Sequence, residues 1–220
     1  MCAPSSNSTP PPGQPTETAM IRLFVAIDLP EPVVDLLQGL AHGIPGARWV
    51  DPTRTHLTLR FIGEVGDARF DDIRIELGRI LTPIFSLELA GVDVFASRRR
   101  PRTLWAGVSA GPELAALQAK VEAAVVRAGV APERRKFSPH VTLARLNGAP
   151  VGRLHEFLSR YGLFRAPAFT VDSFVLYSSH LSRSGALHQA EVEYALNGRA
   201  ADRGVFDVEP GLDSAADLEG

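Results

Sequence analysis

Hydrophobic residues recur along this chain in an order of strands and helices that occurs twice. Residues 21–29 form an apolar run typical of a strand, and the apolar positions of 32–42 recur at helical spacing. About 82 residues later the order returns, with a strand-like run over 103–109 and a helix after it. Each helix is followed by a second strand, and these second strands, His56–Phe61 and His140–Arg145, lie 84 residues apart. The chain therefore contains an internal duplication.

A further helix and a closing strand complete each copy of the repeat. These elements cover residues 67–81, 85–95, 151–161 and 169–177. Two copies of strand–helix–strand–helix–strand predict an α+β protein with two pseudo-symmetric lobes, each a mostly antiparallel sheet covered by helices on one side. We expect the uncovered faces to meet at a central groove, where ligand sites often lie.

The ends of the chain differ in composition from this repeat. Residues 1–19 contain five prolines, and residues 198–220 are acidic and rich in Ala and Gly, so we predict two disordered tails. The domain then spans 20–197, with lobes at about 20–97 and 102–197, and Met20 is a conceivable later translation start. The whole chain carries a formal charge of −2, but the tails hold the excess acid and the middle is mildly basic.

Composition also limits where this protein works. The chain has one cysteine, Cys2, so neither a disulfide framework nor a thiolate metal cluster is expected. It contains no apolar run of membrane-spanning length and no signal peptide. We expect a monomeric protein of the cytoplasm that has no contact with a membrane.

The two second strands carry the same polar pair. His56 and Thr58 alternate with Leu57 and Leu59, and HVTL, which begins at His140 and includes Thr142, repeats the pattern. Because side chains alternate across a strand, each strand presents an imidazole and a hydroxyl on one face and apolar residues on the other. Either pattern alone arises by chance, but two copies at matching places of a repeat predict one shared site.

Two histidines that face one groove can serve as an acid and a base. The ordinary pKa of histidine lies near neutrality, so one ring can accept a proton from water while the other donates one to a leaving oxygen. Threonine hydroxyls can donate to the oxygens of a phosphate. A metal site is the alternative, but no Cys, Asp or Glu lies two residues from either histidine, and we predict no metal and no other cofactor.

Four stretches resemble a known family. HLTLRFIGEV from His56, FSPHVTLAR from Phe137, RLFVAIDLP from Arg22 and LYSS from Leu176 resemble the RNA 2′,3′-cyclic phosphodiesterases of the 2H phosphoesterase superfamily, long called 2′-5′ RNA ligases. The resemblance covers residues 20–196. It implies a bilobal fold with a central groove and metal-free hydrolysis of an RNA-terminal 2′,3′-cyclic phosphate to a 2′-phosphate. The expected partners are RNA 3′ ends or nucleoside 2′,3′-cyclic phosphates.

The resemblance also implies roles for single residues. His56 becomes the proton donor and His140 the acceptor, although the residues themselves form a nearly symmetric pair. Arg102 and Arg145 match arginines of the family and would bind phosphate. Arg145 lies three residues after Thr142, so strict alternation takes it off the His/Thr face unless the strand ends or bulges there.

Two phenylalanines are weighed as platforms for a base. Phe61 continues the alternation of the first motif strand and is assigned to the core. Phe137 precedes the second motif strand and is a candidate for packing a base, with burial an equal alternative. Relatives tend to have a tyrosine three residues after a glycine of the last hairpin, where this chain has Gly185 and His188, which puts a family contact there in doubt.

Two other functions stay open beside hydrolysis. One is ATP-independent 2′-5′ ligation of RNA, which is the reverse chemistry in the same site. The other is a nucleotide- or RNA-binding module that holds phosphate without turnover.

Overall fold

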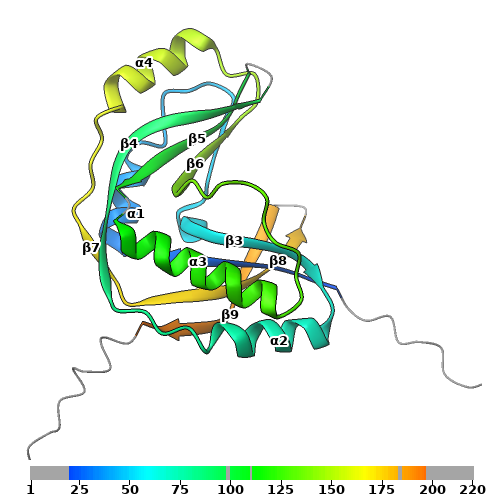
Figure 1. Cartoon of the computed structure of the whole chain (residues 1–220). Coiled ribbons are helices and arrows are strands. Elements are labelled where there is room, and N and C mark those ends of the chain that lie inside the picture. The colour runs from blue at the N-terminus through cyan, green and yellow to red at the C-terminus, as the bar shows by residue number, and fades with distance from the viewer. Residues whose placement is uncertain (1–19, 98–99, 110, 183–184, 197–220) are drawn as a thin grey trace, which may run out of the picture.

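One antiparallel sheet runs through the molecule and joins both halves of the sequence repeat (Figure 1). The computed structural model describes residues 20–97, 100–109, 111–182 and 185–196. Within them the strand order is β7-β4-β5-β6-β3-β1-β8-β9, and β2 pairs with β6 beside this path. The two predicted tails lie outside the described residues. No helix in the described part has the length and apolar character needed to cross a membrane.

The predicted elements are present in the predicted order with shifts at their ends, and β2, η1 and β9 are additional to them. The strands are β1 (Ile21–Asp28), β2 (Ala47–Trp49), β3 (His56–Val65), β4 (Phe85–Ser97), β5 (Arg100–Ser109), β6 (His140–Leu146), β7 (Phe169–Val171), β8 (Ser173–Ser182) and β9 (Gly185–Ala195). The helices are α1 (Glu31–Gln38), the 3-10 turn η1 (Pro52–Arg54), α2 (Asp67–Leu77), α3 (Pro112–Arg127) and α4 (Val151–Tyr161). The predicted strand over 169–177 is divided at Asp172 into β7 and β8.

The two halves of the sequence exchange strands in space. β4, which closes the first repeat, pairs with β5 of the second, and β8 of the second repeat pairs with β1 of the first. The sheet therefore contains two similar sets of three strands, β4-β5-β6 and β8-β1-β3, which meet where β6 and β3 pair. The predicted α+β class and antiparallel sheet are confirmed, and each lobe contains strands from both repeats.

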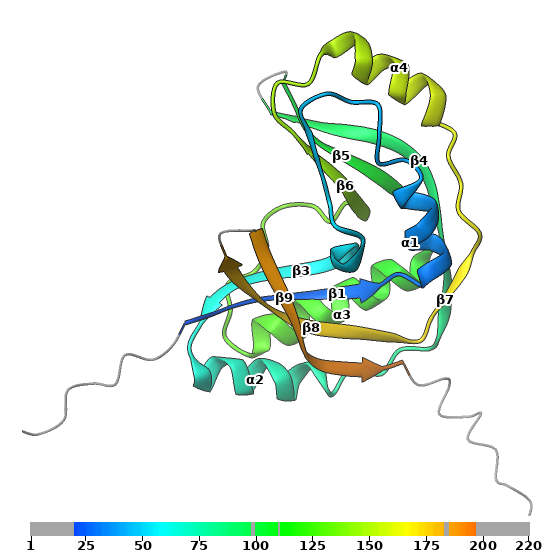
Figure 2. The same ribbon diagram turned by 180° about the vertical axis from the view of Figure 1, so that it is seen from behind.

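The helices α1 and α3 are exchanged in the same way. α3 lies against β3 and beside α2, whereas α1 and α4 lie with β4, β5 and β6 (Figures 1 and 2). α3 shows why the sequence folds so, because its apolar residues fall on one face and are fully buried. They are Leu114, Leu117, Val121, Ala124 and Val125. Burial of a leucine or valine side chain contributes roughly 1.5–3 kcal/mol to folding, so this face fixes α3 on the lobe that carries the first motif.

Candidate active site

The two motif strands lie next to each other at the centre of the sheet. β3 and β6 are antiparallel and pair at Leu57 and Val141, which are both fully buried. Alternation then turns the histidines and threonines of both motifs to the opposite face. There His56, Thr58, His140 and Thr142 line one groove of about 720 Å³. The structure thus brings the four predicted side chains into one groove, and antiparallel pairing sets each histidine across from the threonine of the other motif.

His140 is held in one tautomer by the chain that precedes it. Its Nδ1 atom lies 2.8 Å from the carbonyl oxygen of Ser138, and a carbonyl only accepts, so Nδ1 carries the proton. The lone pair of the neutral ring is then on Nε2. The edges of Phe95 and Trp105 pack near the ring, with centroids 4.8 Å and 6.2 Å away. His140 is therefore oriented to accept a proton at Nε2.

His56 occupies a more enclosed position. Its ring stacks on Phe24 at 4.9 Å, and the rings of Tyr177 and His188 lie 6.3 Å and 5.5 Å away. The pKa of His56 is lowered to about 4, first by burial and then by the positive charge of His188, and a hydrogen bond with the backbone of Arg54 offsets part of this shift. His56 is therefore neutral in the free protein at neutral pH.

A β-bulge follows each motif at the same place in the repeat. Thr58 pairs with Ala26 and Arg60 with Val25, so Leu59 is an extra residue in β3. In β6, Thr142 pairs with Trp105 and Ala144 with Leu104, so Leu143 is the extra residue there. Each bulge reverses the alternation of the strand beyond it. Residues three positions after each threonine thereby return to the groove face.

The second bulge brings Arg145 to the site. Arg145 lines the groove, and its guanidinium donates to the hydroxyl of Thr103 at 2.8 Å. From the sequence, Arg145 could reach the His/Thr face only if the strand ended or bulged after Thr142. The extra Leu143 is such a bulge.

The first bulge overturns the assignment of Phe61 to the core. Phe61 is 63% exposed and lines the groove, whereas its neighbour Arg60 is buried. The prediction was wrong because it continued a period of two through a strand that has one extra residue.

Arg60 is stabilised in the interior by acidic and carbonyl groups. Its Nε atom lies 2.5 Å from a carboxylate oxygen of Glu122 on α3, and Glu133 lies 3.5 Å from another nitrogen. The guanidinium also donates to the carbonyls of Phe61 at 2.5 Å and Ala131 at 2.7 Å. Arg60 thus ties the bulge of the first motif to the segment that leads into the second.

The structure does not bring Arg102 and Phe137 to the groove. Arg102 is exposed and has no partner in the β4–β5 register, because Ala96 pairs with Pro101 and Phe95 with Thr103. Phe137 is half-buried and packs against the core. Neither is among the residues that line the groove in the described part of the chain.

Other cations that line the groove were missed by the sequence. Arg22 belongs to β1, Arg48 to β2 and Arg54 to η1, and all three line it with Arg145. Among the described residues that line the groove, Asp51 is the one acidic side chain. Arg22 is two residues before Phe24, whose ring stacks on His56, so alternation along β1 places Arg22 on the same face. The residues 84 positions later in the second repeat are Pro132 and Ser138, so the repeat gives no signal for Arg48 and Arg54. The excess of arginines makes the groove attractive to anions.

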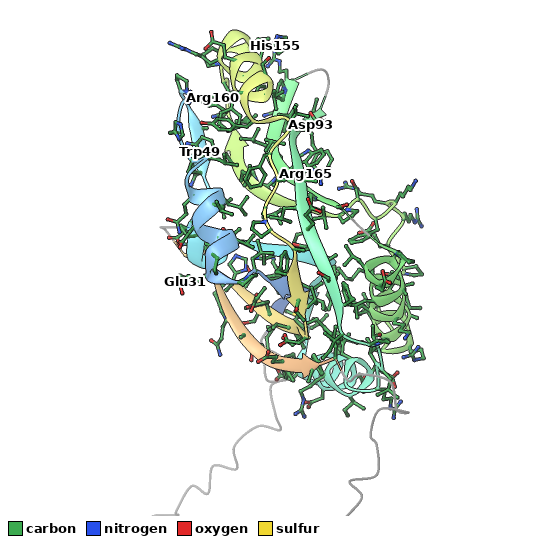
Figure 3. All side chains as sticks on the ribbon, turned by 90° about the vertical axis from the view of Figure 1, so that its left-hand side faces the viewer. Glu31, Trp49, Asp93, His155, Arg160 and Arg165 are labelled. Carbon is green, nitrogen blue, oxygen red and sulfur yellow. The ribbon has the colours of Figure 1, made fainter. Side chains whose placement is uncertain are left out.

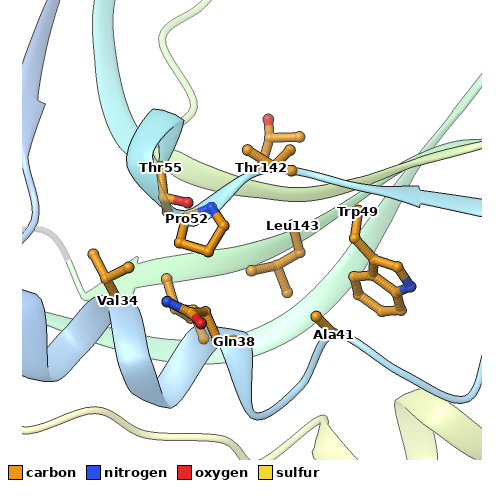
Figure 4. Close-up of a pocket in the computed structure, with 10 residues that line it drawn as sticks. Val34, Gln38, Ala41, Trp49, Pro52, Thr55, Thr142 and Leu143 are labelled. Atoms are coloured by element: carbon orange, nitrogen blue, oxygen red, sulfur yellow. The ribbon is translucent and has the colours of Figure 1, made fainter. Parts of the chain in front are cut away.

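A second, smaller pocket lies beside this groove. It has a volume of about 230 Å³, lies between α1 and the segment from Trp49 to Thr55, and has a largely apolar lining (Figure 4). It shares Trp49, Val50 and Thr142 with the groove but contains neither motif histidine. In the described residues, no group of three or more His, Cys, Asp or Glu side chains could hold a metal ion.

Comparisons with known proteins agree with this geometry. Residues 28–183 match the model of a family described as the 2′-5′ RNA ligase superfamily. A protein of Aeropyrum pernix named RNA 2′,3′-cyclic phosphodiesterase is 37% identical over 169 residues, covering 74% of this chain and 96% of that protein. A protein of the same name from Thermotoga maritima is 30% identical over 184 residues, covering 81% of this chain and 97% of that one.

Solved structures show the same fold. The apo form of LigT from E. coli superposes with a TM-score of 0.68 at 28% identity, covering 81% of this chain and 98% of LigT. LigT in complex with 3′-AMP gives a TM-score of 0.68 at 26% identity, covering 81% of this chain and 99% of LigT.

Proposed function

Because this chain belongs to the 2′-5′ RNA ligase superfamily, we propose that it hydrolyses 2′,3′-cyclic phosphates at RNA 3′ ends to 2′-phosphates. One observation carries the proposal: two His–Thr pairs from equivalent strands of the repeat line one cationic groove. Relatives named RNA 2′,3′-cyclic phosphodiesterase support the choice of substrate, and the complex of LigT with 3′-AMP supports a nucleotide as the kind of ligand.

The two histidines perform the proton transfers. His140 takes a proton at Nε2 from a water molecule, and the water oxygen forms a bond to phosphorus. The bond between phosphorus and the 3′ oxygen breaks, and protonated His56 gives its proton to that oxygen. The product is a 2′-phosphate with a free 3′-hydroxyl, and the two rings return to their starting states by exchange with solvent.

His56 acquires its proton when the substrate binds. In the free protein His56 is neutral, but a phosphate anion beside the ring favours the charged form and raises its pKa. His140 keeps its acceptor nitrogen free because Ser138 fixes the proton on the other one. The different surroundings of the two rings support the division into donor and acceptor.

Other groove residues hold the phosphate and the nucleoside. Thr58 and Thr142 donate from their hydroxyls to the non-bridging oxygens, and Arg145 adds a charge-assisted bond. Phe61, exposed in the groove, offers a ring on which a base can stack. All these groups come from one chain, so we propose a monomer. The two histidines supply both proton transfers, so we propose that the reaction needs no metal.

The test uses an RNA oligonucleotide that ends in a 2′,3′-cyclic phosphate, incubated with the protein and EDTA. We expect a terminal 2′-phosphate. A 3′-phosphate product, or activity that requires added metal, would overturn the mechanism. A second reaction containing RNA with a 5′-hydroxyl tests the reverse chemistry, because the family takes its name from 2′-5′ ligation. Binding without any turnover would show a nucleotide-binding module instead.

A further inference from the structure

A third imidazole stands beside His56 on the donor side of the groove. The rings of His56 and His188 are 5.5 Å apart at centroids, and both contact Phe24. His56 stacks on the face of Phe24 at an angle of 29°, whereas His188 meets Phe24 edge-on at 83°. The three residues come from β3, β9 and β1, so the cluster forms only when the sheet is assembled.

The surroundings of His188 disfavour a charge on its ring. Its Nδ1 atom is buried and forms no hydrogen bond among the described residues. Burial and the nearby positive charge of Arg54 lower the pKa of His188. Ser179, which opposes it across the β8–β9 pair, is uncharged.

The remaining titratable groups near His56 come from the strands on its other side. Asp28 lies opposite His56 in the β1–β3 pair. Its carboxylate accepts a hydrogen bond from the hydroxyl of Tyr177, whose oxygen lies 2.8 Å from each carboxylate oxygen. Burial and this carboxylate raise the pKa of Tyr177, so its hydroxyl stays protonated. Asp51 and Arg54 line the groove with both imidazoles. Of the two titratable rings beside His56, His188 at 5.5 Å is nearer than Tyr177 at 6.3 Å, and it is the one that can carry a positive charge.

We propose that His188 is a positioning residue for proton transfer. Because it lies beside His56, the two rings together hold at most one extra proton until the phosphate of the substrate enters the groove. Two imidazolium rings at this separation repel each other strongly in a half-buried site. A phosphate anion compensates the second charge, so His56 takes its proton from solvent as substrate binds. The inference rests on the proposed function for its purpose, but the coupling between the two rings is a property of the free protein.

The deciding measurement is the pKa of His56 in the free protein, followed by NMR of the histidine rings and assigned with His56→Gln. His188→Phe keeps a ring on Phe24 and removes the charge. We expect the pKa of His56 to rise by about one unit in this variant, while burial still holds it below the ordinary value. An unchanged pKa would overturn the proposal. His155→Phe is the matched control, because His155 is exposed on α4 (Figure 3) and should leave His56 unaffected.

A second variant and a second readout separate this inference from its alternatives. His188→Gln, which is neutral and polar, should raise the pKa of His56 as well and serves if the phenylalanine variant does not fold. In both variants the limb of the kcat/KM profile that reports His56 should move to higher pH, a change that a purely structural role for His188 would not produce. If the pKa rises but the protein hydrolyses no cyclic phosphate, the coupling stands and the proposed function fails.

Discussion

Phe61 and Arg145 occupy equivalent positions of the internal repeat, 84 residues apart, and both line the groove because a β-bulge precedes each of them. Each lies three residues beyond the motif threonine. An aromatic ring on one motif strand and a guanidinium on the other therefore flank the two His–Thr pairs. The repeat thus supplies two similar scaffolds with different chemistry at this one place.

Phe61→Ala should weaken binding of the nucleotide with little loss of stability. The ring is 63% exposed, so its removal creates no cavity, whereas base–aromatic stacking contributes roughly 1–3 kcal/mol. We expect KM for a cyclic-phosphate substrate to rise about 10-fold, with a nearly constant Tm.

Phe137→Ala provides the comparison for Phe61. Phe137 packs half-buried against the core, so its truncation should lower the Tm and change KM less. The reverse result, with KM controlled by Phe137, would show that the base lies against the segment before β6 and that Phe61 has no part in stacking.

Arg60→Met tests the ion pair behind the first bulge. It leaves Glu122 without its partner at 2.5 Å, and loss of one member of a buried pair costs roughly 3–5 kcal/mol. We expect the free energy of unfolding, measured with urea, to fall by about that amount.

The double variant Arg60→Met with Glu122→Gln supplies the control. Removing the second charge should restore part of the lost stability, because the single variant is penalised mainly by an uncompensated carboxylate. Strictly additive losses would show that the two side chains do not depend on each other. Glu133, which is 39% exposed at its side chain, should matter less.

The sequence predicted most of the elements and the side chains of both motifs that meet in one groove, but not the details that depend on one inserted residue or on pairing between distant strands. The duplicated periodicity located both motif strands, because alternation over four residues is a local property. It failed at Phe61, since Leu59 shifts the register and no residue type marks that bulge. Strand exchange between the repeats was equally hidden. His188 enters the site through the pairing of β9 with β8 and of β8 with β1, which no short pattern encodes.

Stability should fall as the pH drops below the ordinary pKa of histidine. The pKa of His56 is about 4 in the folded protein, against 6.5 for a free side chain, so between these values the unfolded chain binds more protons than the folded one. Acidification through this window therefore favours unfolding, by up to about 3 kcal/mol from His56. Urea denaturation of wild type and His56→Gln at about pH 7 and pH 4.5 isolates this contribution, because carboxylates titrate alike in both. Equal slopes against pH would contradict the burial of His56.

His56→Ala and His140→Ala should each reduce kcat by roughly 10²–10⁴-fold, the usual range for loss of a general acid or base. The profile of wild type against pH should be bell-shaped, and each variant should lose one limb of it, because one ring must be protonated while the other is neutral. His155→Ala, on the exposed face of α4, is the control and should keep full activity. The measurement is release of a 2′-phosphate from an RNA with a cyclic end in the presence of EDTA. A wild-type rate in either motif variant removes that histidine from the mechanism. Loss of the same limb of the pH profile in both variants would show that the two rings titrate as one coupled pair.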